Sequence, residues 1–168
     1  MENFDTRDNL KARLGGMLSP DNIYVVEGTV PVLISVPHAV PHMRDGRMKS
    51  DEVNTDMIAM AVQDNTGCHL FVNAGVEGDP NYDDPNVYKG RLLEYVQTHG
   101  VAMVIDLHGA SQEREFDFEL GTGKSDNVAE FPECAKLFAS LPELKGLTIT
   151  IDEFFHSDLF AGLEQEIK

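Results

Sequence analysis

Two short apolar runs, each followed two residues later by a histidine, constrain this chain more than any other feature. Residues 32–36 read VLISV and residues 101–106 read VAMVID, and both runs are rich in β-branched side chains. Short runs of this kind predict buried strands. His38 and His108 each lie two residues beyond their run. Because ligands of open α/β sheets bind beyond the carboxyl ends of strands, we expect both imidazoles at one edge of a sheet.

Further helices and strands are predicted to alternate along the chain. The predicted helices run from Glu52 to Gly67, from Pro85 to Gly100 and over residues 132–140, and the further strands cover residues 68–72, 116–120 and 147–151. At 168 residues the chain fits one domain, residues 1–168. The alternation predicts an α/β fold with a mixed, largely parallel sheet flanked by helices.

The two longer helices carry signals for their ends and their inner faces. Asp84 can cap the second helix, Pro85 suits its first position, and Gly100 is placed to end it. The stripes that we expect to face the core are Val53, Met57, Met60 and Ala61 in the first helix, and Tyr88, Leu92 and Tyr95 in the second.

The charge balance limits the partners of this chain. With 29 acidic and 13 basic residues, the net charge is −16. Such a surface repels phosphate backbones and anionic headgroups, so we expect neither nucleic acid nor a membrane as a partner. The N-terminus lacks the basic and apolar regions of a signal peptide, and the two cysteines fit a reduced chain. We therefore expect a cytoplasmic protein.

The two histidines suggest a metal site. A catalytic zinc ion takes three protein ligands and keeps one open position. The third ligand would be a carboxylate, and either Asp51 or Glu52 at the start of the predicted helix could supply it. Asp106 lies two residues before His108, so both side chains point to the same side of an extended segment. Asp106 can thus accept a hydrogen bond from an imidazole N–H, as carboxylates beside metal-bound histidines often do.

Several motifs together resemble the N-formylglutamate amidohydrolase family. In chain order they are ISVPHAV at residues 34–40, RDGRMK at 44–49, Glu52-x-x-Thr55, DPNYD at 79–83, DLHG at 106–109 and GTG at 121–123. The resemblance implies a phosphorylase/hydrolase-like fold related to the zinc carboxypeptidases. It implies zinc held by His38, Glu52 and His108, with Glu52 preferred to Asp51 because the family's glutamate lies three residues before the threonine.

The resemblance also implies an activity, the hydrolysis of the amide bond of an N-acyl amino acid such as N-formylglutamate. Zinc would lower the pKa of a bound water to about 7 and polarise the amide carbonyl. The family places a proton-transferring glutamate in a Gln-x-Glu-Ile type segment near the C-terminus, which makes Glu166 the candidate here. Family members usually continue well beyond this length, so we expect a chain that is shortened at its C-terminus, a fragment, or degenerate.

A carboxylate-bearing small substrate would require cations near the metal. Arg114 and Arg44 are the candidates, since arginine can hold a carboxylate through two hydrogen bonds or stabilise an oxyanion. Asn81 and Tyr82 are further candidates for the lining of the pocket, although the same segment also has good turn chemistry.

Other functional classes fit less well. Residues 121–125 resemble the end of a phosphate-binding loop, but Phe118 occupies the position of its first glycine. Residues 79–83 resemble the start of a calcium loop, but Asp84 stands at the glycine position and Gly90 at the glutamate position. The alternative that stays open is a non-catalytic module of the same fold that binds a metal or a small ligand.

Overall fold

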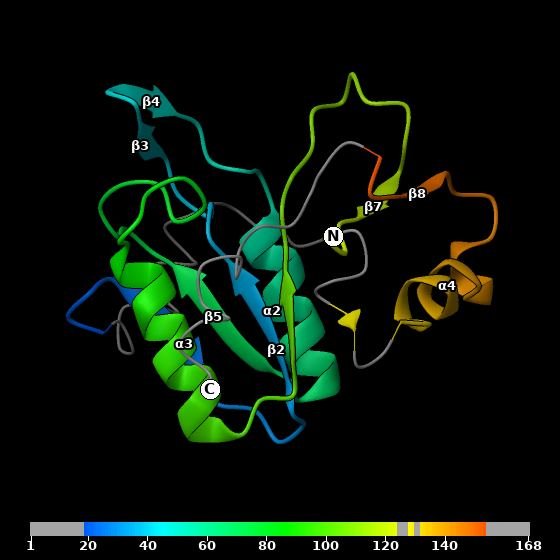
Figure 1. Cartoon of the computed structure of the whole chain (residues 1–168), viewed down its shortest axis with the longest axis horizontal. Coiled ribbons are helices and arrows are strands. Elements are labelled where there is room, and N and C mark those ends of the chain that lie inside the picture. Colours follow the sequence, from blue (N-terminus) through cyan, green and yellow to red (C-terminus); the bar gives the residue numbers. More distant parts are fainter. Residues whose placement is uncertain (1–18, 124–127, 130–131, 154–168) are drawn as a thin grey trace, which may run out of the picture. The chain divides into compact units, whose positions relative to one another are not determined.

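A mixed sheet of four strands organises the first part of the chain (Figure 1). The computed structural model describes residues 19–123, 128–129 and 132–153. The strand order is β1 (Ile23–Val26), β5 (His69–Asn73), β2 (Val32–Val36), β6 (Met103–Asp106). Strand β2 runs parallel to both of its neighbours, whereas β1 pairs antiparallel with β5. The predicted α/β class with a mixed sheet flanked by helices is confirmed.

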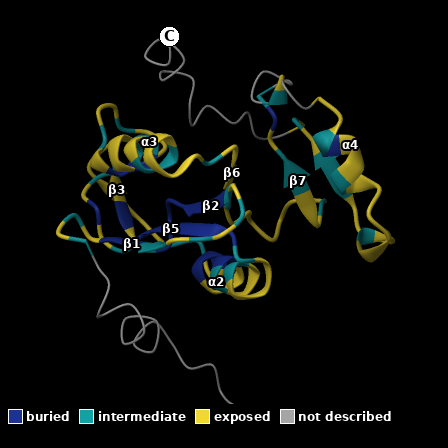
Figure 2. Ribbon diagram, turned by 90° about the horizontal axis from the view of Figure 1, so that it is seen from below, coloured by how far each residue is buried: buried dark blue, intermediate teal, exposed yellow. Residues whose placement is uncertain are grey.

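Contacts divide the chain into two units, residues 1–110 and residues 111–168. The four-stranded sheet belongs to the first unit. Helix α2 (Thr55–Thr66) and helix α3 (Val87–His99) lie on opposite faces of this sheet (Figure 2). The expectation of a single domain over residues 1–168 stays a prediction.

Each face of the sheet has its own apolar cluster. On the α2 face, Ala59 packs with alternate residues of β2 and β5, among them Ile34 and Leu70. On the α3 face, Tyr88 and Leu92 are buried, and the Tyr88 ring lies edge-on to Phe71. The alternation of strand side chains explains this division, because successive residues of one strand point to opposite faces.

The hydroxyl of Tyr88 ties α3 to two strands at once. It lies 2.9 Å from the hydroxyl of Ser35, accepts a hydrogen bond from the backbone N–H of Val36 and donates one to the carbonyl of Phe71. Burial raises the pKa of Tyr88 well above its ordinary value, so the phenol stays protonated and can donate. A buried hydroxyl with satisfied hydrogen bonds fixes where α3 lies along β2 and β5.

Most predicted elements of this unit are confirmed, with shifted ends. The strand at residues 32–36 matches β2 residue for residue, and β5 and β6 lie one to two residues from their predicted starts. Gly100 ends α3 in a left-handed conformation, as expected. Strand β1 was not predicted, although its sequence, IYVV, is a short β-branched run of the kind that indicates a strand.

The predicted starts of both longer helices are wrong, and so is the predicted cap of the second. In the first helix, Val53, Met57 and Ala61 are exposed, so three of the four residues expected to face the core do not. Helix α2 begins at Thr55, not at Glu52, and it buries Thr55 and Ala59, while Val53 precedes the helix and is 72% exposed. Small side chains face the sheet because they let the helix approach closely. Helix α3 begins at Val87, and the side chain of Asn86, not Asp84, caps it by accepting the backbone N–H of Tyr88.

Residues 37–50, for which no helix or strand was predicted, contain a hairpin. Strand β3 (His42–Arg44) pairs antiparallel with β4 (Arg47–Lys49). Asp45 and Gly46 form the two-residue turn with φ values of 52° and 70°. A turn with positive φ at both residues matches the twist of a hairpin, and Asp-Gly is a favoured pair for it.

The second unit is smaller. Its described residues form α4 (Cys134–Ala139), the 3-10 helix η2 (Pro142–Leu144) and a parallel pair of strands, β7 (Phe118–Leu120) and β8 (Ile149–Ile151). These elements confirm the predicted strands and helix in this region with shorter ends. Over the described part of the chain, no helix combines the length and apolar character needed to cross a membrane.

Candidate metal centre

Three neighbouring parallel strands deliver the polar side chains of the site. His38 follows β2, His108 follows β6, and Asp79 lies in the loop after β5. Parallel strands end at the same edge, so these residues meet although they are far apart in the sequence. The buried amide of Asn73, at the end of β5, donates to the carbonyl of Pro37 at 2.8 Å and so anchors the residue before His38.

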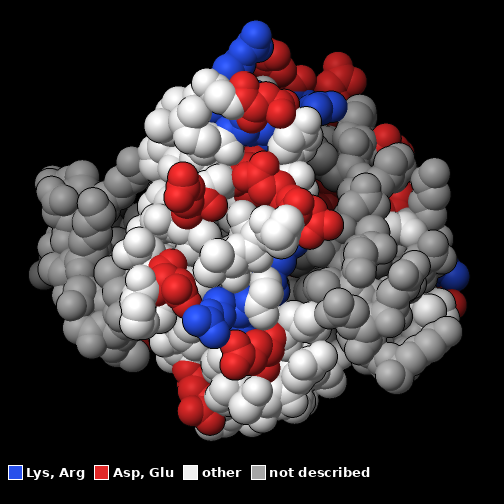
Figure 3. Space-filling model, turned by 60° about the vertical axis from the view of Figure 1, so that its left-hand side comes forward, with Lys and Arg blue, Asp and Glu red and all other residues white. Residues whose placement is uncertain are grey.

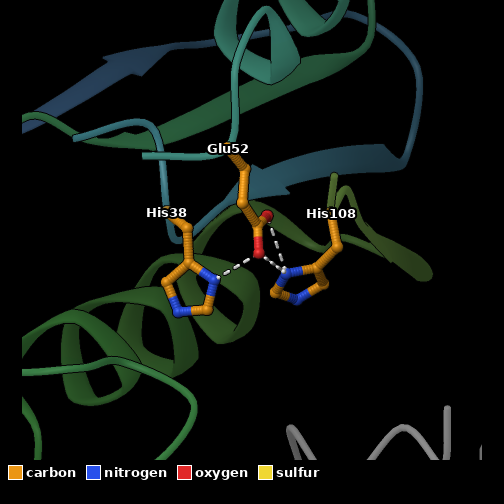
Figure 4. Close-up of side chains that lie close together, drawn as sticks. All are labelled: His38, Glu52 and His108. Carbon is orange, nitrogen blue, oxygen red and sulfur yellow. Dashed lines mark hydrogen bonds and ion pairs between the residues drawn. The ribbon is translucent and has the colours of Figure 1, made fainter. Parts of the chain in front are cut away.

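The carboxylate of Glu52 lies between the two imidazoles (Figure 4). Its Oε1 lies 2.9 Å from Nδ1 of His38, and its Oε2 lies 3.1 Å from Nδ1 of His108. One candidate ligand atom from each of these three residues lies within 4.8 Å of the others. The structure thus brings together the three residues named as metal ligands, and it places Glu52 rather than Asp51 between the histidines.

The backbone around Glu52 fixes its position. Its N–H donates to the carbonyl of His38 at 2.9 Å, and its carbonyl accepts the Thr55 hydroxyl at 2.8 Å. The N–H of Gly109 donates to Oε2 of Glu52 at 2.9 Å. A side chain at position 109 would place its Cβ only 3.0 Å from the Cβ of Glu52. Glycine therefore lets the backbone after His108 approach this carboxylate.

A second carboxylate holds the outer nitrogen of each imidazole. Nε2 of His38 lies 3.0 Å from Oδ1 of Asp79, and Nε2 of His108 lies 2.9 Å from Oδ2 of Asp106. Nε2 of each ring thus faces an outer carboxylate, while Nδ1 is the nitrogen turned toward Glu52. Carboxylates in this position orient metal-bound histidines and increase their basicity. The predicted role of Asp106 fits this geometry.

The electrostatics of the metal-free site are those of a tight ion pair. Burial raises the pKa of the Glu52 carboxyl, but hydrogen bonds from His108 and His38 outweigh burial and lower this pKa to about 2. Burial lowers the pKa of His108, but hydrogen bonds to Asp106 and Glu52 outweigh it and raise this pKa to about 10. Without a metal, a protonated His108 thus neutralises Glu52.

The donor set fits a divalent metal such as zinc. A tetrahedral zinc ion with ligands at about 2.1 Å places its ligand atoms about 3.4 Å apart. The contacts from Glu52 to the two histidines span 2.9–3.4 Å. Among the described residues, the buried Oδ1 of Asp106 has no hydrogen-bond partner. The side chain of His108 is 35% exposed, so this side of the site is open for a fourth ligand.

A second group of candidate ligands, His38, His42 and Asp79, fits a metal less well. All three residues are buried, and their ligand atoms also lie within 4.8 Å of one another. However, Nε of Arg44 lies 2.5 Å from Oδ2 of Asp79, so a cation already occupies this carboxylate. The His42 ring stacks on the His38 ring at 4.2 Å between centroids. His42 and Asp79 therefore fix the orientation of the His38 ring.

The residues predicted to bind substrate take different positions. Nδ2 of Asn81 lies 2.9 Å from Nε2 of His108, beside the open side of the site. The guanidinium of Arg44 lies over the ring of the exposed Tyr82, 5.4 Å from its centroid. A hydrogen bond to Asp45 raises the pKa of the Tyr82 hydroxyl. Asn81 therefore contacts a candidate ligand, Arg44 is joined to one through Asp79, and Tyr82 contacts Arg44.

Two predicted residues stay without a test. Arg114 belongs to the second unit, so its expected role is still a prediction. Glu166 lies outside the described residues.

Two residues of the site were missed by the sequence analysis. His42 lies in a segment for which no helix or strand was predicted, and Asp79 was interpreted as part of a turn. The four-residue spacing of His38 and His42 was the available signal for the first, while nothing local in the sequence connects Asp79 to His38.

The distribution of charged side chains on the surface reflects the negative net charge of the chain. In Figure 3, acidic side chains are spread over the visible face of the described residues, and basic ones occur in small groups. In the part of the first unit that the structure describes, three of the five basic residues lie on the β3–β4 hairpin: Arg44, Arg47 and Lys49. Positive charge is thus concentrated on the segment between His38 and Glu52.

No family model, no curated protein and no solved structure matches this chain. The resemblance to the N-formylglutamate amidohydrolase family therefore stays a prediction from the quoted motifs.

Proposed function

We propose that this chain is a zinc-dependent hydrolase that cleaves the amide bond of an N-acyl amino acid, with N-formylglutamate as the first substrate to test. One observation supports the proposed metal site. The carboxylate of Glu52 lies between Nδ1 of His38 and Nδ1 of His108, while two further carboxylates hold the opposite nitrogens of these rings.

In this proposal the three ligands have distinct tasks. His38 is the buried, fixed ligand, Glu52 supplies the negative charge, and His108 faces the open side where a substrate would approach. Zinc held there would supply a Lewis acid and a water with a pKa of about 7. The amide of Asn81, beside His108, would hydrogen-bond to the substrate near the bond to be cleaved.

The choice of substrate rests on the family resemblance and on Arg44. Nε of Arg44 is bound to Asp79, and among the described residues the two terminal nitrogens have no hydrogen-bond partner. A guanidinium oriented in this way can hold a substrate carboxylate. Glu166 is the proposed group that moves a proton to the leaving nitrogen, with Arg114 as a second substrate contact.

A non-catalytic metal- or ligand-binding module is the second candidate. One observation favours it: three groups already contact the Glu52 carboxylate in the metal-free chain, namely Nδ1 of His38, Nδ1 of His108 and the N–H of Gly109. A network that is complete without metal can serve structure alone.

The test compares two neighbouring carboxylates. Purified chain is stripped with a chelator and reloaded with zinc, and the bound metal is counted by mass spectrometry. We expect one zinc per chain and zinc-dependent release of formate from N-formylglutamate. Glu52→Gln should lose more than about 100-fold in zinc affinity, because even removing a partner of a metal ligand costs 10–100-fold.

Asp51→Asn is the matched control, since it removes an adjacent carboxylate that does not lie between the histidines. It should bind zinc as the parent chain does. Zinc binding without turnover of any N-acyl amino acid would identify a binding module. A parent chain that binds no zinc would overturn the proposed function.

A further inference from the structure

The carboxylate of Asp79 joins two parts of the site that the proposed function treats separately. Its side chain is fully buried, at 0% exposure. Oδ1 accepts Nε2–H of His38 at 3.0 Å and the backbone N–H of Asn81 at 2.9 Å. Oδ2 lies 3.2 Å from Nε2 of His42 and 2.5 Å from Nε of Arg44. One oxygen thus faces a candidate metal ligand, and the other faces the hairpin.

Besides Asp79, the hairpin contacts the His38 ring through His42 and the Tyr82 hydroxyl through Asp45. His42 and Arg44 both lie on β3, at alternate positions, so their side chains share one face of the hairpin. On the opposite face, Met43 and Met48 form a cross-strand pair and are 39% and 67% exposed. The face that carries His42 and Arg44 is therefore the one attached to the body, and Asp79 is the group to which both bind.

Asp79 is itself held rigidly by the loop after β5. Its backbone N–H donates to Oδ2 of Asp83 at 2.7 Å, and its carbonyl accepts the N–H groups of Tyr82 and Asp83. Its rotation is restricted from both ends, by these turn contacts and by the donors on its carboxylate. A rigid acceptor can transmit the orientation of one partner to the others.

We propose that Asp79 is a positioning residue that couples the His38 end of the metal site to the β3–β4 hairpin that carries Arg44. If His38 held a metal, its imidazole ring would be fixed, and the ring would hold the carboxylate of Asp79 through Nε2. The carboxylate would then fix His42 and Arg44, and with them the hairpin. Metal binding and the placement of the substrate-binding arginine depend on the same side chain. This inference rests on the proposed function.

The test measures zinc affinity and hairpin order in the same variants. Zinc affinity is obtained by competition with a chromogenic chelator, and hairpin order by hydrogen exchange of the backbone amides of residues 42–49 with and without zinc. In the parent chain we expect zinc to slow the exchange of these amides. In Asp79→Asn we expect a 10–100-fold loss of zinc affinity, faster exchange without zinc, and no further change when zinc is added.

A double variant, His42→Phe with Arg44→Met, separates the two halves of the coupling. The phenyl ring can keep the stacking on His38, while both donors from the hairpin to Asp79 are removed. We expect zinc affinity to stay within about threefold of the parent, because the bond from Asp79 to His38 remains. Zinc should no longer slow exchange of the hairpin. This variant also tests the coupling if Asp79→Asn does not fold.

Asp84→Asn is the control for loss of a nearby negative charge, and it should match the parent in both measurements. The coupling is wrong if Asp79→Asn binds zinc like the parent, or if zinc slows hairpin exchange equally in the double variant. Two zinc ions per parent chain would also overturn it, since Asp79 would then be a ligand of the second ion. A parent chain that binds no zinc defeats the proposed function instead, because the variants then have no zinc affinity to compare.

Discussion

The two histidines of the candidate metal centre have opposite surroundings. The side chain of His38 is 4% exposed and hydrogen-bonds to Asp79. The Asp79 side chain is fully buried and has donors on both oxygens. The side chain of His108 is 35% exposed and hydrogen-bonds to Asp106. Among the described residues, one oxygen of Asp106 has no hydrogen-bond partner. One candidate metal ligand is therefore part of the core, and the other lies at the surface. We expect the surface histidine to contribute less to the stability of the fold.

Alanine substitutions of the two histidines should give the largest effects and test the contrast between them most directly. His38→Ala and His108→Ala should each reduce zinc affinity by more than about 100-fold, because each removes a ligand. Their effects on the metal-free fold should differ. We expect His38→Ala to lower the free energy of unfolding by about 3 kcal/mol, since it leaves a cavity and takes a donor from buried Asp79. His108→Ala should cost about 1 kcal/mol.

Urea denaturation of the stripped protein measures this difference. His99→Ala is the control, because His99 is exposed at the end of α3, and it should change the unfolding free energy by less than about 0.5 kcal/mol. Equal losses for the His38 and His108 variants would show that burial does not distinguish the two ligands.

The carboxylates behind the histidines should show a smaller contrast of the same kind. Asp106→Asn should reduce zinc affinity by about tenfold, at the low end of the usual range, because water can replace part of its contact with exposed His108. The loss should be smaller than that for Asp79→Asn. Isothermal titration with zinc gives both values, and a greater loss for Asp106→Asn would reverse the comparison.

The pH dependence of the metal-free protein should give the smallest effect. The pKa of His108 is raised to about 10 in the fold, against about 6.5 in an unfolded chain. Its stabilising contribution is therefore complete below about pH 6.5 and is lost as the pH rises through about 10. Because this side chain is partly exposed, we expect a loss of only about 1 kcal/mol between pH 7 and 10.

His108→Gln supplies the reference for this measurement. Other groups titrate near pH 10 in both proteins, so the difference between the two unfolding curves isolates His108. A difference that does not shrink as the pH rises would contradict the ion pair with Glu52 and Asp106.

The sequence predicted the parts of the site that depend on local signals. The run at residues 32–36 is short, apolar and followed by Pro37, and these features suffice to place His38 at a strand end. His108 follows a run of the same kind. That both histidines lie at one edge of the sheet follows from the rule that ligands of open α/β sheets bind beyond the carboxyl ends of strands. That β6 lies directly beside β2 was not predicted.

The parts that could not be predicted depend on tertiary contacts. Asp79 lies 41 residues from His38, and its own segment has ordinary turn chemistry, so nothing nearby revealed its partner. Hydrophobicity alone suggested Val53 and Met57 for the inner face of α2, whereas the close approach of helix and sheet favoured Thr55 and Ala59. Local pattern does not report how closely two elements pack.

The backbone hydrogen bond from Glu52 to the carbonyl of His38 has a consequence for protein engineering. It closes residues 39–51 into a loop whose two ends are held together independently of its tip. Lengthening such a loop costs little, since the entropy of closure grows only slowly with length. Insertions at the Asp45–Gly46 turn should therefore leave the distance between the two ligands unchanged. A reporter peptide or a longer recognition hairpin could be grafted there.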